Sequence, residues 1–391
     1  MNKTNNSNNI QKRRKVKKNK MNIETLMGIL FILTLFLFIS LNIITPDKEI
    51  SQKEKRFLEQ KPVLNITNLR DGTYMKKFEN FLSDQFAFRD FYIQLNSKTE
   101  LLLGNKESNG IYYGKNDYLF EKPSSFSEYD IKNREAIKIF SEKHKDLNTY
   151  MMIVPNSISI LNEYLPNFLP IENQLEQIED WKNYLGDSLN FIDLYYTMKS
   201  NSDKYIYYRT DHHWTTLGAY YAFQKFADIA NINYSFENYQ DYPVKNNFSG
   251  TLEAKSGFDV KDDIINVFVP KEIEKLIVTD IETGEISASL YDSKNLFSDE
   301  PYAVFMGGNR PIIEIKTLSE SNRNLIIFKD SYANSFIPFA TPYFNSIYIV
   351  DPRYYYGNIE NIINDKKITD ILFLYNANTL FKDSSIYQIL Q

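Results

Sequence analysis

The sequence predicts an α/β domain on a mostly parallel sheet, preceded by one transmembrane helix near the N-terminus. Short apolar runs typical of buried strands alternate with segments of helical periodicity, from Tyr150–Val154 to Ile371–Leu374. Strands that alternate with helices in this way are the pattern of an α/β sheet. Near the start, Leu26 to Ile44 is a charge-free stretch of 19 residues. This is close to the roughly 20 residues that a helix needs to cross a bilayer core.

The first 20 residues form a basic tail with eight Lys and Arg and no acidic residue. Under the positive-inside rule, this tail (1–20) stays in the cytoplasm and the chain beyond the anchor (21–45) lies outside. The apolar run ends in bulky residues, Leu41 to Ile44, and not in a small-residue cleavage site. We therefore expect an uncleaved single-pass anchor in the cell membrane, with a cleaved signal peptide as the alternative.

Composition narrows the possible partners and chemistry. Of the 45 Lys and Arg, eight lie in the tail, which leaves 37 against 50 Asp and Glu. The exterior part is therefore acidic, and we do not expect nucleic acid as a partner. The chain has no Cys, which excludes a disulfide framework and thiolate chemistry. Nothing in the sequence implies a cofactor or a metal requirement.

Beyond the anchor, residues 46–72 are polar and form the expected connector to an exterior domain, 73–391. Apolar spacing predicts helix faces within 75–104 and a short-turn hairpin over 111–120. From about 233 to 300 the apolar residues no longer follow a helical periodicity, and we expect an insertion there. Thr215 or Thr216 is available to cap a helix at 217–229. The other expected elements are helices at 128–145, 173–184, after Ala333 and at 358–366, and strands at 150–154, 189–194, 204–208, 325–328, 347–350 and 371–374.

The run Thr210-Asp211-His212-His213-Trp214-Thr215 holds two of the three histidines of the chain. An imidazole held by a carboxylate is the base half of a nucleophilic triad. In an extended chain alternate side chains share a side, which favours His213 over His212 as the partner of Asp211. We expect Trp214 to pack beneath the site.

Ser331 is the candidate nucleophile. It follows the apolar run at 325–328 and precedes a helix whose N-terminal amides could face a developing oxyanion. In this interpretation His213 takes the Ser331 proton and the Ser331 oxygen attacks an ester carbonyl. Further candidates for contacting the oxyanion or the substrate are Asn376, after the last strand, the turn at Gly307-Gly308-Asn309, and Arg353.

Simpler explanations remain open for each of these residues. The Asp-His-His run could cap the following helix, and Ser331 or Asn376 could be an ordinary cap or turn residue. Gly307-Gly308-Asn309 could be a plain turn, and Arg353 could make a surface ion pair. A zinc site would need carboxylates to complete its ligands, because only His144 remains as a further histidine.

Several motifs together resemble a known family. They are Asp211–Trp214, Asp84-Gln85-Phe86-Ala87-Phe88-Arg89, Val154-Pro155-Asn156, Met306-Gly307-Gly308-Asn309, Lys329-Asp330-Ser331-Tyr332-Ala333-Asn334 and Ile349-Val350-Asp351-Pro352-Arg353-Tyr354-Tyr355. In these motifs the chain resembles the bacterial DHHW family, which is similar to the alginate O-acetylation proteins with their permuted SGNH-hydrolase-like domain.

The resemblance implies a circularly permuted, SGNH-hydrolase-like three-layer sandwich in which Asp211, His213 and Ser331 are catalytic. It also implies that Asn376 is the strand-end asparagine of the oxyanion hole and that the Asp351–Tyr355 turn follows the second strand. The chain departs from the wider pattern at Lys329, where Gly is common, and at Thr210, where an Asp-x-x-His spacing would place Asp. The second departure is normal for the permuted relatives.

We therefore expect a membrane-anchored, extracytoplasmic O-acetyltransferase that passes acetyl through an acyl-serine to hydroxyls of a cell-surface polysaccharide. The resemblance implies a membrane-bound O-acyltransferase as the partner that relays acetyl across the membrane. An acetylesterase that uses the same three residues is one alternative. A non-catalytic envelope scaffold for polysaccharide modification or export is the other.

Overall fold

A computed structural model describes residues 22–51, 56–166, 169, 172–235, 239–271 and 275–390. The expected basic tail, 1–20, lies outside these residues. The chain divides into two compact units, Met1–Glu49 with Phe57–Arg89, and Ile50–Arg56 with Asp90–Gln391. Each unit is described by itself.

The first unit contains the apolar helix that the sequence predicts near the N-terminus. Helix α1 (Ile23–Ile44) has 22 residues, and among the described residues only this helix is long and apolar enough to cross a membrane. None of its residues is buried. Two further helices follow in this unit, α2 (Ile66–Arg70) and α3 (Thr73–Asp84). The two-residue strands β1 (Ile50–Ser51) and β2 (Arg56–Phe57) lie at the sequence boundary between the units.

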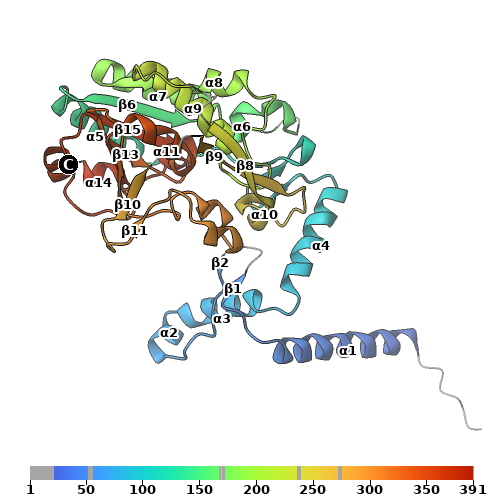
Figure 1. Ribbon diagram of the computed structural model, residues 1–391. Helices are drawn as coiled ribbons and strands as arrows, with labels where there is room; N and C mark the ends of the chain where they lie inside the picture. The colour runs from blue at the N-terminus through green and yellow to red at the C-terminus, as the bar shows by residue number, and fades with distance from the viewer. Residues whose placement is uncertain are drawn as a thin grey trace, which may run out of the picture. The chain divides into compact units, whose positions relative to one another are not determined.

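The second unit is built on a mixed sheet of eight strands in the order β11-β10-β12-β14-β13-β15-β6-β7. Figure 1 labels β6, β10, β11, β13 and β15 of this sheet. The strands from β14 to β7 pair in parallel, whereas β12, β10 and β11 extend the sheet antiparallel. The strand bounds are β6 Asn148–Val154, β7 Asn190–Ile192, β10 Leu276–Asp280, β11 Ile286–Ser287, β12 Ile312–Thr317, β13 Asn324–Lys329, β14 Ser346–Val350 and β15 Asp370–Asn376. The prediction of a large, mostly parallel sheet is confirmed.

Helices cover both faces of this sheet, which gives three layers. Along β13, Leu325 and Ile327 pack into one apolar core while Ile326 and Phe328 pack into the other, because successive side chains of a strand point to opposite faces. The first core is closed by α8 (Tyr195–Ser200), α9 (Thr216–Ile229) and α11 (Ala333–Ala340). The second is closed by α5 (Asp130–Lys143), α7 (Gln174–Leu185), α12 (Ile359–Asp365), α13 (Ala377–Leu380) and α14 (Ile386–Ile389).

Smaller elements surround the sheet. The expected hairpin is present as β4 (Ile111–Tyr113) and β5 (Leu119–Glu121), with β3 (Glu107–Ser108) on its edge. In the region expected to be an insertion, β8 (Tyr239–Phe248) pairs with β9 (Asp263–Pro270), and α10 (Thr251–Ser256) lies between them in sequence. Within the described residues, the other helices are α4 Arg89–Leu102, α6 Ser157–Ile160 and the 3-10 helices η1 Lys115–Asp117, η2 Asn162–Tyr164, η3 Gly186–Ser188, η5 Ser293–Phe297, η6 Pro301–Val304 and η7 Thr341–Tyr343.

The expected strand at 204–208 is wrong. Tyr207 forms only an isolated bridge with Trp214, because the chain reverses direction between them. The reversal is closed by hydrogen bonds from Thr215 N to Ile206 O (2.9 Å) and from Tyr208 N to His213 O (3.3 Å). The helix after it begins as expected, since the Thr215 hydroxyl accepts a hydrogen bond from Gly218 N and caps α9.

Candidate active site

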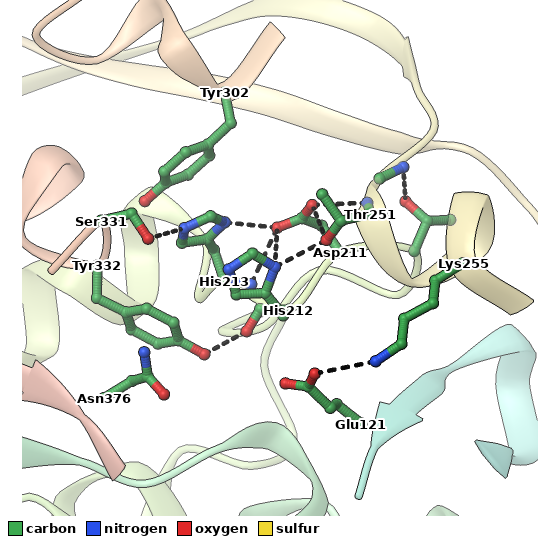
Figure 2. A network of polar contacts seen from close by, with 12 residues as sticks. Glu121, Asp211, His212, His213, Thr251, Lys255, Tyr302, Ser331, Tyr332 and Asn376 are labelled. Carbon is green, nitrogen blue, oxygen red and sulfur yellow. Dashed lines mark hydrogen bonds and ion pairs between the residues drawn. The ribbon is translucent and has the colours of Figure 1, made fainter. Parts of the chain in front are cut away.

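The candidate site forms where the Asp-His-His loop meets the turn after β13 (Figure 2). His213 Nε2 lies 2.7 Å from Ser331 Oγ, and His213 Nδ1 lies 2.6 Å from Asp211 Oδ1. All three residues come from the second unit, with the serine 118 positions after the histidine. The structure therefore brings a hydroxyl, an imidazole and a carboxylate into one hydrogen-bonded chain.

A bend, and not an extended chain, puts Asp211 on the same side as His213. The carboxylate Oδ1 accepts a hydrogen bond from the backbone N–H of His213 (3.0 Å) as well as contacting its ring. Aspartate commonly bonds to the backbone two residues on and so makes a tight turn. The expected pairing is therefore present, but the extended backbone from which we argued for it is not.

The neighbouring His212 has a different environment. Its ring lies 3.9 Å from that of His213, and its Nδ1 contacts Thr251 Oγ1 at 2.7 Å, away from Ser331. Thr251 also donates to Asp211 Oδ2 from its backbone N–H (2.9 Å) and its hydroxyl (3.0 Å). The first residue of α10 thus holds the second carboxylate oxygen of Asp211 in place.

Burial sets the protonation of the site. The His213 imidazole is buried beside a second imidazole, and these two effects lower its pKa to about 4 despite the nearby Asp211. Burial alone would raise the pKa of Asp211, but the adjacent imidazoles of His213 and His212 and its hydrogen bonds hold it well below its usual value. At neutral pH the pair is therefore a carboxylate and a neutral imidazole, which can accept a proton from Ser331.

The chain matches the model of a known protein family. This family model, described as "DHHW protein", matches residues 107–350, which are more than half of the chain. The chain belongs to the DHHW family. Among the curated proteins none matches this chain.

Two solved structures with TM-scores of 0.60 and 0.63 support the same fold. A DHHW family protein from Eubacterium siraeum is 25% identical with a TM-score of 0.63, and the match covers 72% of this chain and 95% of that one. PatB1 of Bacillus cereus, solved with a sulfonyl adduct, is 20% identical with a TM-score of 0.60 and coverage of 71% and 98%. The O-acetyltransferase domain of Pseudomonas putida AlgJ is 13% identical with a TM-score of 0.45 and coverage of 72% and 98%.

In this DHHW protein the turn that carries Ser331 is fixed by buried polar side chains. The Asp330 carboxylate accepts hydrogen bonds from Tyr332 N (2.9 Å) and from Asn376 N (2.9 Å). Burial raises the pKa of Asp330, while the nearby Arg353 and these hydrogen bonds oppose that rise. The backbone N–H of Ser331 donates to no other described residue. It lies two residues before the first residue of α11, Ala333.

Lys329, the departure from the common Gly, occupies a specific place under this turn. Its side chain is only 1% exposed, and its Nζ donates to Asn309 Oδ1 and Asn334 Oδ1, both at 2.8 Å. Asp351 Oδ2 lies 3.5 Å away. Burial lowers the pKa of Lys329 to about 8, although Asp351 opposes this. The lysine therefore joins the ends of β13 and β14 to the first turn of α11.

The remaining sequence candidates lie in three different environments. Asn376 is buried, and its amide nitrogen donates to Asp330 Oδ2 (2.5 Å) and Thr379 Oγ1 (2.7 Å), so both of its N–H groups are already used. Arg353 binds the buried Asp351 through two of its nitrogens, at 2.8 and 2.6 Å, as an ion pair. Gly308 has a φ of +89° in a left-handed turn, which presents Asn309 to Lys329 and Asn334.

Trp214 and Tyr302 form the apolar surroundings of the histidine. Trp214 is fully buried, as expected, and donates from Nε1 to Tyr332 O (3.0 Å) and Ser335 Oγ (2.9 Å). It therefore supports the serine turn from below and is not exposed to a ligand. The ring of Tyr302 stacks on that of His213 with centroids 3.8 Å apart. Neither Tyr302 nor Thr251 was a candidate from the sequence, because both lie in segments without a clear periodic pattern.

The zinc alternative uses the same atoms. Asp211, His212 and His213 each offer a ligand atom, and these atoms lie within 4.8 Å of one another. However, the two ring nitrogens of His213 face Asp211 and Ser331, and both oxygens of Asp211 accept hydrogen bonds. A metal at this position would have to replace contacts that the described side chains already make.

Proposed function

We propose that this protein is a membrane-anchored, extracytoplasmic O-acetyltransferase that acts through an acyl-serine at Ser331. The observation that carries the proposal is the unbroken chain from Ser331 Oγ to His213 Nε2 (2.7 Å) and from His213 Nδ1 to Asp211 (2.6 Å). Chains of this geometry activate a serine for acyl transfer on several unrelated folds. The acceptor is a hydroxyl of a cell-surface polysaccharide.

The steps follow from the positions of the three side chains. Ser331 Oγ attacks the acetyl carbonyl of the donor and forms a C–O bond while its proton passes to His213 Nε2. His213 then protonates the departing donor group, which leaves acetyl on Ser331. An acceptor hydroxyl next gives its proton to His213 and attacks the acetyl carbon, and Ser331 recovers a proton from His213. Asp211 orients the imidazole and stabilises its transient positive charge.

The oxyanion donors in this proposal differ from those expected. The Ser331 N–H makes no hydrogen bond to another described residue. The side-chain oxygen of Asn309 accepts hydrogen bonds from Lys329 and Asn334, so its NH₂ group is the end not engaged by these two residues. We assign the oxyanion to these two groups. Asn376 would then support the turn through Asp330, since its own amide is occupied.

The strand order supports a permuted SGNH-like domain. Counted from β13, the parallel strands lie as β14-β13-β15-β6-β7, which is the 2-1-3-4-5 order of a common doubly wound fold. Strands β13, β14 and β15 hold positions 1, 2 and 3 of this order, and β6 and β7 hold positions 4 and 5. In the sequence, however, β6 and β7 come before β13, β14 and β15, as expected after a circular permutation. In such sheets the ligand crevice lies at the carboxyl ends where the strand order reverses. Ser331 follows β13 at that point.

A cleft of about 850 Å³ opens beside the ends of β14 and β15, with Arg353, Tyr356, Thr379, Lys382 and Gln388 among its walls. Ser331, His213 and Asp211 do not line this cleft, so we do not place the reacting acceptor hydroxyl there. Helix α1 anchors the chain with its N-terminus in the cytoplasm, and a membrane-bound O-acyltransferase delivers the acetyl group.

Replacing the nucleophile tests this function. With nitrophenyl acetate as donor, Ser331→Ala should lower turnover by about 10³-fold or more, because the acyl-serine cannot form. His213→Ala should be similarly impaired and His212→Ala much less so. Asn190→Ala, on the edge strand β7, is a control that should retain activity. Unchanged turnover in Ser331→Ala would refute the serine mechanism.

The same assay separates the proposal from its alternatives. A transferase should move acetyl to added cell-wall oligosaccharides in preference to water, whereas an acetylesterase should give free acetate whether or not they are present. A protein that turns over no acetyl ester and forms no adduct would be a scaffold.

A further inference from the structure

The part of the first unit that follows α1 exposes much of its apolar surface. Between Phe57 and Arg89, only Leu58 and Ala87 are buried among the described residues. Large apolar side chains exposed in this segment are Phe57, Val63, Leu64, Ile66, Leu69, Met75, Leu82, Phe86 and Phe88. A soluble protein rarely leaves a surface of this kind uncovered, so the segment is expected to meet another apolar phase.

Helix α3 has the clearest apolar stripe. Five large apolar residues lie at helical spacing on one side of this helix: Tyr74, Met75, Phe78, Phe81 and Leu82. Of these, Met75 is 59% exposed and Leu82 is 53% exposed. Two aromatic contacts run along the stripe, from Tyr74 to Phe78 (centroids 6.0 Å apart) and from Phe78 to Phe81 (6.1 Å). The opposite side carries only polar residues: Lys76, Lys77, Glu79, Asn80 and Ser83. A helix divided in this way suits the boundary between water and lipid.

The segment Asp84–Arg89 connects this helix to the end of α1. Asn42 Oδ1, in the last turn of α1, accepts a hydrogen bond from Ala87 N at 2.9 Å. The Phe86 ring lies 6.0 Å from that of Phe38, and the Gln85 amide bonds to both the N–H and the C=O of Lys48 at 2.9 Å. The C-terminal end of α3 is therefore held at the level where α1 ends.

We propose that the apolar stripe of α3 lies in the outer leaflet of the membrane that α1 crosses. A helix of 22 residues is about 33 Å long, which matches a hydrocarbon core of about 30 Å. Since Asn42 and Lys48 mark the end of that span, the attached α3 lies at the headgroup level. There its apolar side enters lipid and its polar side faces water. This inference rests on the proposed anchoring role of α1 and not on the chemistry at Ser331.

Single-cysteine labelling of the full chain tests the proposal directly, because the chain has no cysteine of its own. The variants are Met75→Cys and Leu82→Cys on the stripe, with Asn80→Cys and Ser83→Cys as matched controls on the other side. Each carries an environment-sensitive fluorophore in vesicles of phosphatidylethanolamine and phosphatidylglycerol. Quenching is measured with nitroxide-labelled lipid and with aqueous iodide.

We expect lipid nitroxide to quench the labels at 75 and 82, and iodide to quench those at 80 and 83. Iodide quenching of all four labels would overturn the proposal. Protection of the labels at 75 and 82 from both quenchers would also overturn it, in favour of a contact with protein. A label at Phe36→Cys, within α1, shows whether α1 itself is in the membrane. Lipid nitroxide should quench this label independently of the position of α3, so a wrong prediction for α3 can be distinguished from a wrong prediction for α1.

Discussion

At the residue scale, adjacent histidines in one loop have separate environments. His213 contacts Asp211 at 2.6 Å and Ser331 at 2.7 Å and is buried. His212 contacts Thr251 at 2.7 Å, lies 3.7 Å from Asp211 Oδ1 and is partly exposed. In the proposed mechanism only the neutral form of His213 can accept the serine proton. The acid limb of the activity profile should therefore report the His213 pKa.

The expected acid limb lies near pH 4, since burial lowers the His213 pKa to about 4. Activity should rise as pH increases through this value and stay level towards neutral pH. The charge of His212 contributes to this lowering, so His212→Ala should raise the His213 pKa and move the limb to higher pH. The measurement is kcat/KM against pH with nitrophenyl acetate. His144→Ala, which removes the remaining histidine, is the control and should leave the limb in place. A limb that does not move in His212→Ala would contradict the assignment.

That Asp211, His213 and Ser331 would meet could be predicted from their residue types, from their places after expected strands and from the family resemblance. The residues that support these three could not be predicted. Asp211, His213 and Ser331 lie together as the sequence indicated, although a bend in the loop and not strand alternation accomplishes this. Asn376 and Arg353 have strong partners in Asp330 and Asp351, which are themselves distant in sequence. A hydrogen-bond partner brought in by folding leaves no local pattern in the sequence.

At the element scale, α10 supports the carboxylate of Asp211. Its first residue donates two hydrogen bonds to Asp211 Oδ2, and the positive end of a helix favours a carboxylate there. Close approach depends on Gly250, because a Cβ at this position would lie 2.4 Å from Asp211 Cβ and 2.5 Å from Thr210 O. This element belongs to the region we expected only as an insertion, so its contribution to the site could not be predicted.

Gly250→Ala should therefore displace Asp211 and disturb the orientation of His213. A misplacement of this kind can lower activity by about 10²-fold, and we expect a loss of that order in kcat/KM. The matched control is Ser249→Ala, which changes the adjacent exposed residue and should retain activity. Circular dichroism and thermal unfolding would verify that both variants are folded. Full activity in folded Gly250→Ala would contradict a role for this contact.

At the scale of the whole chain, the sequence predicted the layered sheet but not its extent. The central strands β13, β15 and β6 were identifiable because they are continuous apolar runs buried on both faces. The antiparallel strands β10 and β12 were not expected. Strand β10 lies in the segment that we interpreted as an insertion, and in β12 the charged Glu314 and Lys316 interrupt the apolar run. The N-terminal apolar helix α1 was the simplest element to predict, since its length and apolar composition define it.

The central claim is that Ser331 carries the acetyl group, and intact mass spectrometry of the full chain tests it most directly. After exposure to an acetyl ester, we expect one added acetyl group, mapped by peptide analysis to Ser331 and absent in Ser331→Ala and His213→Ala. Acetyl groups found only on other residues, or an equal yield in the Ser331→Ala variant, would contradict the account.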